Sequence, residues 1–347
     1  MTIKTTTKPR LLTGDTPTGK LHLGHWVGSL ENRLQLQDAY ECYFLIANVH
    51  AFTTRAESPQ AIHDSVIDIT LDYLAAGIDP AKSTVFVQSD IPAIAEMTCF
   101  FSMLVPFSRL MRNPTIKDEI RDKGLGDHYA FGFLLYPVGQ VADILVFRPA
   151  VVPVGEDQVP HLEMAREVAR RFNQLYCAGQ EGLFPIFEPK LGRTKRLVGL
   201  GGPSPTGQLL KMSKSLNNAI YLSDDADAIK KKVMSMYTDP NRLKATDKGT
   251  VENNPLWIFH DTFNPDTAWV QDAKARYQAG DIGDVTCKQK LIEVLVALIE
   301  PMRARRLQFE KDPAYVRDVL RAGSEKANKI ANETTQRAKE AMQQEYT

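Results

Sequence analysis

Two histidines separated by two residues follow the first apolar segment of the chain. Residues 13–30 read TGDTPTGKLHLGHWVGSL, so a Gly- and Pro-rich turn leads to His22-Leu23-Gly24-His25 at the start of an expected helix. The N-terminus of a helix has unpaired N–H groups and the positive end of the helix dipole, and both attract phosphate. Two imidazoles there can donate hydrogen bonds to a phosphate group, and Gly24 lets a nucleotide approach the main chain. Two incidental surface histidines are the alternative interpretation.

A second candidate group, Lys211-Met212-Ser213-Lys214-Ser215, follows the Gly-rich stretch GLGGPSPTGQ. Lysine is a flexible point charge suited to polyphosphate, so two lysines flanking a serine hydroxyl on a mobile loop can close over a leaving pyrophosphate. Charge stabilisation of this kind can supply most of the barrier reduction in phosphoryl and nucleotidyl transfer. A solvated basic loop is the alternative, but the pairing with the two histidines favours nucleotidyl chemistry.

These groups need a framework, and the first half of the chain predicts an α/β sheet with parallel strands. Short apolar runs rich in β-branched residues alternate with helical patterns. One helix is expected from Gly24, and another starts with Ser58 and Pro59 as N-cap and first helical residue and ends near Gly77. The expected strands are residues 10–14, 42–49, 84–88 and 150–154.

The second half of the chain has a different character. Gly and Pro dominate residues 179–208, which predicts a long exposed loop. After Asn218 the pattern is almost wholly helical, and residues 288–308 have one apolar face. Asp312 and Pro313 are expected to start a further helix that Gly323 ends, with the last helix beginning at about Ser324.

The composition is that of an ordinary soluble globular protein, with 43% apolar and 24% charged residues. Lys+Arg and Asp+Glu both total 42, so an RNA partner would have to meet local basic patches. The four cysteines are far apart, which argues against a disulfide framework and against a zinc or iron–sulfur site. Without a secretory leader or a long apolar run, the protein is expected in the cytoplasm and not in a membrane.

HLGH together with KMSKS resembles the two signature motifs of the class I aminoacyl-tRNA synthetases. Further stretches are similar to the bacterial type of the tryptophanyl-tRNA synthetase family. They are VFVQSDIP at residues 85–92, YPVGQVADIL at 136–145, VPVGEDQ at 152–158 followed by HLE, and DDADAIKKKVMSMYTDP at 224–240. The resemblance covers nearly the whole chain.

This resemblance implies a Rossmann-like (HUP) parallel-sheet catalytic domain over residues 1–217, with a helical connecting insertion at about residues 95–145. An all-α anticodon-binding domain over residues 218–347 would follow, its last helix packing back on the catalytic domain. The implied reaction activates L-tryptophan with ATP to tryptophanyl-adenylate and transfers it to tRNA(Trp), releasing pyrophosphate and AMP. The implied cofactors are ATP and Mg²⁺, with the metal carried by ATP and not by dedicated protein ligands.

The resemblance also assigns roles to individual positions. An indole has one polar atom, a donor N–H, so its pocket needs one acceptor and apolar walls, and Asp143 matches the acceptor. The other matches to tryptophan-binding positions are Leu12, Gly14, Tyr136, Gln140, Val152, Val154 and Gln158. The matches to ATP-binding positions are Thr16, Gly24, His25, Gly155, Asp157, Lys211, Met212 and Lys214. The matches to catalytic positions are His22, His25, Lys211, Ser213 and Lys214.

Two positions depart from the family pattern, since Thr16 stands where many members have Gln and Gln140 where many have Met. A Gln three residues before an Asp also occurs in the tyrosine enzymes, which keeps a tyrosyl-tRNA synthetase as an alternative. Leu11 and Leu12 argue against it, because those enzymes have a Tyr in this strand. A small-molecule adenylyltransferase and a non-catalytic RNA-binding paralogue are the remaining alternatives.

The resemblance further implies a homodimer formed through the insertion helices. Most basic runs are solvated helix faces, but one or more of three runs is expected to contact tRNA phosphates, because phosphate neutralisation dominates such affinity. The runs are Arg109, Arg112, Lys117, Arg121 and Lys123; Lys230, Lys231 and Lys232; and Arg303, Arg305 and Arg306.

Overall fold

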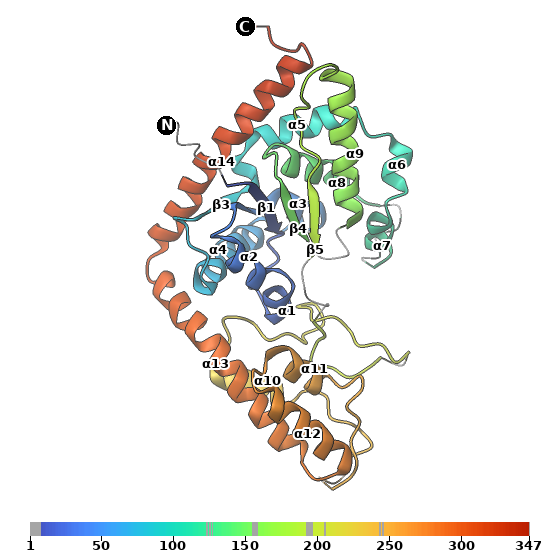
Figure 1. The fold of residues 1–347 in the computed structure, drawn as a ribbon, viewed down its shortest axis with the longest axis vertical. Coiled ribbons are helices and arrows are strands. Elements are labelled where there is room, and N and C mark those ends of the chain that lie inside the picture. Colours follow the sequence, from blue (N-terminus) through green and yellow to red (C-terminus); the bar gives the residue numbers. More distant parts are fainter. Residues whose placement is uncertain are drawn as a thin grey trace, which may run out of the picture.

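The computed structural model describes residues 8–122, 124, 126, 128–154, 159–191, 197–204, 206–242, 244 and 246–346. At its centre is a parallel five-stranded sheet in the order β3-β2-β1-β4-β5 (Figure 1). Alternate residues of β2 enter two separate apolar cores, with Phe44 in one and Tyr43 in the other, so both faces of the sheet are covered. The predicted α/β fold class is confirmed. The strands are β1 (Arg10–Asp15), β2 (Glu41–Ile46), β3 (Ser83–Val87), β4 (Val151–Val154) and β5 (Glu188–Leu191).

Helices pack around the sheet and form the lower part of the molecule in Figure 1. The helical segments before β4 are α1 (Leu23–His25), the π-helical η1 (Trp26–Leu30), α2 (Glu31–Leu36), α3 (Asn48–Arg55), α4 (Pro59–Ala76), the 3₁₀ turn η2 (Gln88–Asp90), α5 (Pro92–Ser102), α6 (Phe107–Met111), α7 (Pro114–Asp122) and α8 (Phe131–Leu145). Those after β4 are α9 (Val159–Tyr176), α10 (Ala226–Met234), α11 (Pro255–Phe263), α12 (Thr267–Ala279), α13 (Asp284–Glu310) and α14 (Pro313–Ala341).

The central strand β1 separates two halves of the sheet. β2 and β3 lie on one side of it, and β4 and β5 on the other. Open parallel sheets bind ligands outside the carboxyl ends of the strands at such a change in strand order. Gly14 lies at this end of β1, where an added Cβ would be 2.3 Å from the carbonyl oxygen of Leu45. The glycine therefore lets β1 and β2 approach each other at the edge where a ligand is expected.

The prediction that Gly323 ends a helix is wrong. α14 continues from Pro313 to Ala341, and the Asp312 side chain accepts a hydrogen bond from the N–H of Tyr315 at its start, as the sequence predicts. A Cβ at position 323 would lie 1.8 Å from the carbonyl oxygen of Val85. The residue is glycine because α14 packs directly on the main chain of β3, and the helix then runs along the sheet to the top of Figure 1.

α13 is fastened to α4 by two arginines of one predicted basic run. Arg306 is 3% exposed, and its guanidinium donates to Asp68 and Asp72 of α4. Nε of Arg305 donates to the carbonyl oxygen of Ala75 at 2.6 Å. These contacts engage most of the run in packing, so it is a poor candidate for binding RNA.

Two further predictions need correction. β2 ends at Ile46 and not at residue 49, because Asn48 already begins α3. Residues 179–208 include β5, and Phe184 and Phe187 are buried there, so this segment is not an exposed loop throughout. The sequence of β5, EPKL, lacks the apolar run that marks the other strands. By contrast, α4 begins at Pro59 and is followed by Gly77 in the left-handed conformation, as predicted.

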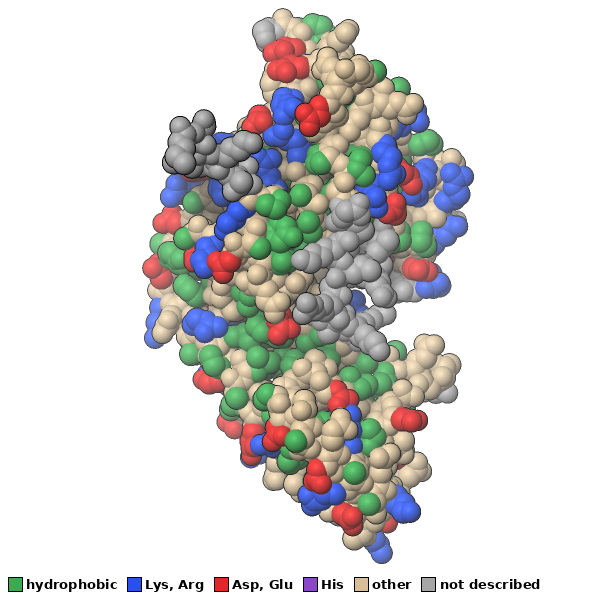
Figure 2. All heavy atoms as spheres, in the orientation of Figure 1, with side chains coloured by type: hydrophobic (Ala, Val, Ile, Leu, Met, Phe, Trp, Pro, Cys, Tyr) green, Lys and Arg blue, Asp and Glu red, His purple; other side chains and the backbone are tan. Residues whose placement is uncertain are grey.

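The face of the molecule in Figure 2 mixes acidic and basic side chains over both the upper body and the lower helical part. This distribution agrees with the equal totals of the two kinds of charge. Across the part of the chain that the structure describes, every helix is too short or too polar to cross a membrane.

Candidate active site

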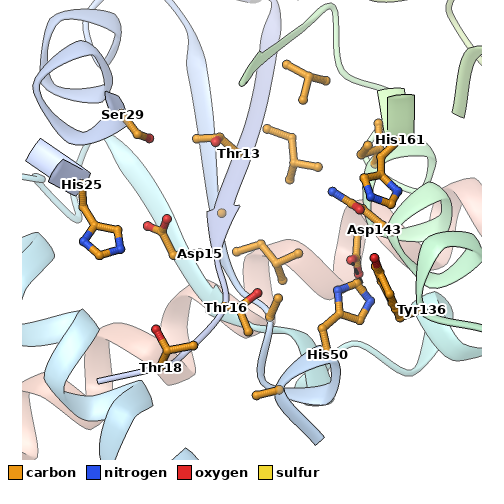
Figure 3. Close-up of a pocket in the computed structure, with 18 of the residues that line it drawn as sticks. Thr13, Asp15, Thr16, Thr18, His25, Ser29, His50, Tyr136, Asp143 and His161 are labelled. Atoms are coloured by element: carbon orange, nitrogen blue, oxygen red, sulfur yellow. Dashed lines mark ion pairs between the residues drawn. The ribbon is translucent and has the colours of Figure 1, made fainter. Parts of the chain in front are cut away.

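A cavity of about 600 Å³ lies outside the carboxyl ends of β1, β2 and β4. His25 and Lys211 line one part of it, called here the histidine–lysine end. Tyr136, Asp143 and Val152 line the other part, the Asp143 end, and Figure 3 shows β1 running between the two. Small-molecule sites are commonly between about 300 and 1,000 Å³, so the cavity is of the size of a ligand site.

At the histidine–lysine end, main-chain hydrogen bonds determine the tautomers of His22 and His25. The N–H of Gly24 donates to Nδ1 of His22, and the N–H of His22 donates to Nδ1 of His25, each at 3.1 Å. A neutral imidazole that accepts at Nδ1 carries its proton on Nε2. Both rings therefore have a donor at Nε2, and His25 lines the cavity.

Both histidines are neutral at neutral pH. Burial, with the positive charges of Lys211 and Lys214 nearby, lowers the pKa of His22 to about 3. Burial also lowers the pKa of His25 to about 4, although the neighbouring carboxylate of Asp15 acts in the opposite direction. These side chains can donate hydrogen bonds to phosphate oxygens without changing their own protonation state.

The KMSKS segment is shaped by Asn218 and anchored by Met212. The Asn218 side chain accepts from the N–H of Ser213 at 2.7 Å and donates to the carbonyl oxygen of Lys211 at 3.1 Å. Met212 is 1% exposed and belongs to the apolar core, whereas Lys211 reaches the cavity. With the methionine buried, Lys211 is left on the exposed side of the segment. The hydroxyl of Ser213 lies 2.9 Å from that of Ser215.

Lys214 rests against the turn that precedes HLGH. Its Nζ donates to the carbonyl oxygen of Gly19 at 2.7 Å and to the hydroxyl of Thr18 at 3.2 Å. Burial lowers the pKa of this ammonium group to about 8. Lys214 is therefore a cation at neutral pH, placed where a phosphate group could replace its neutral partners.

HLGH and KMSKS lie side by side although they are far apart in sequence. The N–H of Leu23 donates to the carbonyl oxygen of Ile220 at 2.9 Å, and the N–H of Leu222 donates to that of Leu21 at 3.0 Å. A Cβ added to Gly24 would lie 2.9 Å from the His22 ring and 3.5 Å from Cβ of Met212. The absence of a side chain at Gly24 therefore lets HLGH and KMSKS pack closely against each other.

A buried ion pair, missed from the sequence, borders the same end. Arg33 donates to the carboxylate of Asp15 at 2.8 Å and to the hydroxyl of Tyr73 at 2.7 Å. Burial alone would raise the pKa of Asp15, but the charge of Arg33 holds it below its ordinary value. Arg33 thus keeps the carboxylate of Asp15 ionised near His25, and both residues line the cavity.

The Asp143 end is an apolar slot with one buried carboxyl group. Leu12 and Val152, each 3% exposed, line it together with Tyr136 and Gln140. Asp143 is also 3% exposed, and burial raises its pKa to about 7 against the lowering effect of a hydrogen bond from Gln88. An aromatic ligand with a single donor would find one acceptor and apolar walls here.

His50 and His161 accompany Asp143 and were not among the residues predicted from the sequence. Nε2 of His50 lies 3.5 Å from Oδ2 of Asp143, and both groups are labelled in Figure 3. The ring of Tyr136 packs between the two imidazoles, with centroids 5.9 Å from His50 and 5.8 Å from His161. Burial, followed by the charge of His161, lowers the pKa of His50 to about 4, so this ring is neutral.

The cavity brings together nine of the residues assigned by resemblance: Leu12, Gly14, Thr16, His25, Tyr136, Gln140, Asp143, Val152 and Lys211. His22, Gly24, Met212, Ser213 and Lys214 lie around its histidine–lysine end without lining it. Gly155, Asp157 and Gln158 fall outside the residues that the structure describes, as does the side chain of Val154.

One signal would have found several of the missed residues. Asp15 ends β1, His50 follows β2 and Gln88 follows β3, so all three lie at carboxyl ends of parallel strands. Polar residues at these positions face the ligand edge of such a sheet. The sequence contained this information, but it becomes specific only when the strand order is known.

A family model matches most of the chain, and relatives of similar sequence match nearly all of it. Residues 4–300 match the family model described as tRNA synthetases class I (W and Y). The chain is 50% identical to a tryptophan–tRNA ligase of Clostridium longisporum over 345 residues, which covers 98% of each chain. It is 47% identical to a tryptophan–tRNA ligase of Streptococcus pneumoniae over 348 residues, covering 98% of this chain and 99% of the relative.

A solved structure agrees in fold over almost the whole length. The tryptophanyl-tRNA synthetase of Campylobacter jejuni, complexed with ADP and tryptophan, superposes with a TM-score of 0.82 at 30% identity. The match covers 96% of this chain and 99% of that one.

Proposed function

Because this chain belongs to the class I tRNA synthetases of the W and Y family, we propose that it ligates L-tryptophan to tRNA(Trp) at the expense of ATP. The relatives that share about half of its residues are tryptophan–tRNA ligases, and the matches span nearly the full length of both chains. The tyrosine alternative has less support.

One observation carries the proposal at the level of chemistry. A single cavity joins a buried carboxyl in an apolar slot, Asp143, to a cluster of phosphate-seeking donors that includes His25 and Lys211. An amino acid bound by its indole at the first place would direct its carboxylate along β1 toward a nucleotide at the second. Such positioning of two reactants is itself a large part of catalysis.

In the first step, the tryptophan carboxylate attacks the α-phosphorus of ATP and pyrophosphate leaves. Nε2–H of His22 and His25 donates to phosphate oxygens, while Lys211 and Lys214 neutralise the charge that grows on the pyrophosphate. No side chain forms a covalent intermediate. Thr16, Gly24 and Met212 shape the nucleotide side, and Gly155 and Asp157 contact the ribose by resemblance.

In the second step, a hydroxyl of the terminal tRNA ribose attacks the acyl carbon of the adenylate and AMP leaves. Asp143 accepts from the indole N–H throughout. Leu12, Gly14 and Val152 form walls, and Tyr136 and Gln140 contact the remaining tryptophan surface. By resemblance alone, Val154 belongs to the walls and Gln158 to the contacts. Mg²⁺ would be held by ATP and, when bound, would supply positive charge to its phosphates. In the described part of the chain no three His, Cys, Asp or Glu side chains converge as a metal site.

The decisive experiment is ATP–pyrophosphate exchange with each of the twenty amino acids, followed by a tRNA charging assay. We expect exchange with tryptophan and charging of tRNA(Trp). Preference for tyrosine would favour the tyrosyl-tRNA synthetase. Exchange without charging would favour a small-molecule adenylyltransferase, and the absence of exchange with every amino acid would favour a non-catalytic paralogue.

We also propose that two copies associate through the insertion helices. Met103, Phe107 and Phe131 are 76%, 67% and 75% exposed, and an apolar hollow of about 520 Å³ opens beside α5 and α8. Exposed apolar side chains and an apolar hollow on these segments are typical of a protein interface. Sedimentation analysis should give twice the mass of the chain, and a monomer would contradict this part of the proposal.

The remaining assignments concern the helical part and the cell. We propose that residues 218–347 bind the anticodon arm of tRNA(Trp) and that the enzyme works in the cytoplasm. Lys230 and Lys231 of α10 are exposed and remain candidates for phosphate contacts, whereas Lys232 is paired with Asp224 at 2.6 Å. Replacing Lys230 and Lys231 with Ala should weaken tRNA charging without affecting pyrophosphate exchange.

A further inference from the structure

Gln88 joins two elements that line the Asp143 end. It begins η2 at the carboxyl end of β3 and is 3% exposed. Its Nε2 donates to Oδ1 of Asp143 on α8 at 2.8 Å. Its Oε1 accepts from the N–H groups of Val49 and His50 in the first turn of α3, at 3.1 and 3.3 Å.

The direction of the Gln88 amide is fixed by its surroundings. Main-chain N–H groups can only donate, so the amide oxygen must face Val49 and His50. The amide nitrogen is then left to face Asp143, whose ionised form can only accept. One side chain thus secures the start of α3 and also presents a donor to the buried carboxyl group.

The hydrogen bond favours the charged form of Asp143. Donation to a carboxylate stabilises the anion, and here it opposes the burial that raises the pKa of Asp143 to about 7. Oδ1 is engaged by Gln88, which leaves Oδ2 on the side of His50. An indole N–H entering the slot would meet an oriented acceptor.

Among the described residues, burial and the hydrogen bond from Gln88 are the causes that shift the pKa of Asp143. His50 from α3 is neutral because burial lowers its pKa to about 4, and burial raises the pKa of Tyr136 on α8 itself. His161 from α9 and Glu119 from α7 line the same cavity. On the side of α5 and η2, Glu96 is paired with Lys339 and Asp90 accepts from Ser324.

We propose that Gln88 is a positioning residue for amino-acid selection: it holds the Asp143 carboxylate as the oriented acceptor for the indole N–H. The inference rests on the proposed function. It extends the binding site to a side chain that directly follows β3, and it gives the Gln of VFVQSDIP a specific role. Gln88 acts through Asp143 and does not touch the reacting atoms.

The test compares the wild type with Gln88→Met in pyrophosphate exchange. Methionine has a similar length but no donor. At pH 7 we expect the KM for L-tryptophan to rise about tenfold with kcat unchanged, because a hydrogen bond to a charged group is lost. The KM difference should shrink toward pH 9, since Asp143 without its donor ionises at a higher pH.

A substrate analogue separates selection from general damage to the site. In β-(3-benzothienyl)alanine, sulfur replaces the indole N–H, so the analogue has nothing to give Asp143. Its KM should be the same in both enzymes, and the preference for tryptophan over the analogue should fall about tenfold in Gln88→Met. An equal loss for both substrates would overturn the proposal.

The chain offers a matched control in Gln37. This glutamine is also buried, donates to the carbonyl oxygen of Gly77 at 3.3 Å and accepts from the N–H of Asp79 at 2.7 Å. It lies outside the cavity lining. Gln37→Met should lower thermal stability while leaving the KM for tryptophan and its pH dependence at wild-type values.

If Gln88→Met does not fold, Gln88→Glu decides the question. Its carboxyl oxygen still accepts from Val49 and His50, and a proton shared with Asp143 replaces the amide donor at low pH, because two adjacent carboxylates do not both ionise readily. Its KM for tryptophan should therefore rise with pH, opposite to Gln88→Met. A KM that parallels the wild type would overturn the inference.

The outcomes also distinguish this inference from the proposed function. A wild-type enzyme without tryptophan-dependent exchange would contradict the function itself. A wild-type enzyme selective for tryptophan, with unchanged KM and selectivity in the Gln88 variants, would contradict only the role of Gln88.

Discussion

The two ends of the cavity place their polar groups by different means. At the histidine–lysine end, main-chain N–H groups direct His22 and His25, and main-chain and hydroxyl oxygens receive Lys214. At the Asp143 end, the carboxyl group is directed by another side chain, Gln88, in surroundings that raise its pKa to about 7. At neutral pH the histidines of the first end are neutral and its lysines are charged. The carboxyl group of Asp143 at the other end has a pKa close to neutral pH.

The difference follows from what each end has to recognise. Phosphates carry full charges, so neutral donors and lysines in defined places are sufficient. An indole offers one weak donor on an apolar body, and an acceptor for it must be buried to exclude other ligands. Burying a carboxylate opposes folding. The acceptor that gives selectivity at the Asp143 end therefore lowers the stability of the folded protein.

The largest effect is expected at the histidine–lysine end. Lys214→Ala should lower kcat for pyrophosphate exchange by about 10²- to 10³-fold, because charge on the leaving pyrophosphate is no longer neutralised. The KM for tryptophan should stay unchanged, since that end of the cavity is intact. Lys231→Ala, on the exposed face of α10, is the matched control. Near-wild-type exchange in Lys214→Ala would break the comparison.

Asp143→Ala should have the second largest effect and appear in selectivity. Loss of the acceptor is expected to reduce kcat/KM for tryptophan about 100-fold, while the low activity with phenylalanine and tyrosine changes little. Exchange rates with the three amino acids measure this. Unchanged discrimination would remove Asp143 from the tryptophan site.

Asp143→Asn tests whether burial of the carboxyl group makes the free energy of unfolding depend on pH. The raised pKa means that folded Asp143 holds a proton that the unfolded chain releases above its ordinary pKa of 3.8. The free energy of unfolding of the wild type therefore falls as pH rises from about 4 to about 7 through this group, whereas Asn contributes no such fall. Relative to the wild type, the variant should gain about 3 kcal/mol over that interval, since one pKa unit corresponds to about 1.4 kcal/mol, and keep the gain above it.

Urea unfolding of both proteins at pH 5 and pH 8 measures this gain. A difference between the two proteins that is the same at both pH values would show that Asp143 does not titrate as described.

The smallest effect is the alkaline limit of activity. Lys214 has a pKa of about 8, so kcat/KM for ATP should fall up to about tenfold per pH unit above that value as its charge is lost. Lys214→Arg should move this limit upward, because a guanidinium group remains charged. His22 and His25 should add no transition between pH 5 and pH 7, since their pKa values are about 3 and about 4. A transition there would contradict their assignment as neutral donors.

Local patterns predicted four of the five strands and the helical character of the chain after residue 218, because apolar periodicity reports directly on burial. The strand β5 was not predicted, because its sequence EPKL has no apolar pattern. It is a strand through its pairing with β4. The glycine at position 323 predicts a helix end because glycine is common there, whereas in the structure it allows α14 to contact Val85 of a distant strand. The basic residues Arg305 and Arg306 were candidates for RNA because their partners on α4 cannot be seen from sequence.

HLGH and KMSKS predicted nucleotidyl chemistry from their residue types, whereas the Asp143 segment was assigned to tryptophan through its resemblance to the family. Only the tertiary structure decided that HLGH meets KMSKS, that one cavity connects them to Asp143, and that Gln88 donates to that carboxyl group. The reason is physical: a side chain's identity is fixed by its own position, whereas its hydrogen-bond partner and the burial that sets its pKa depend on residues brought together from several strands and helices.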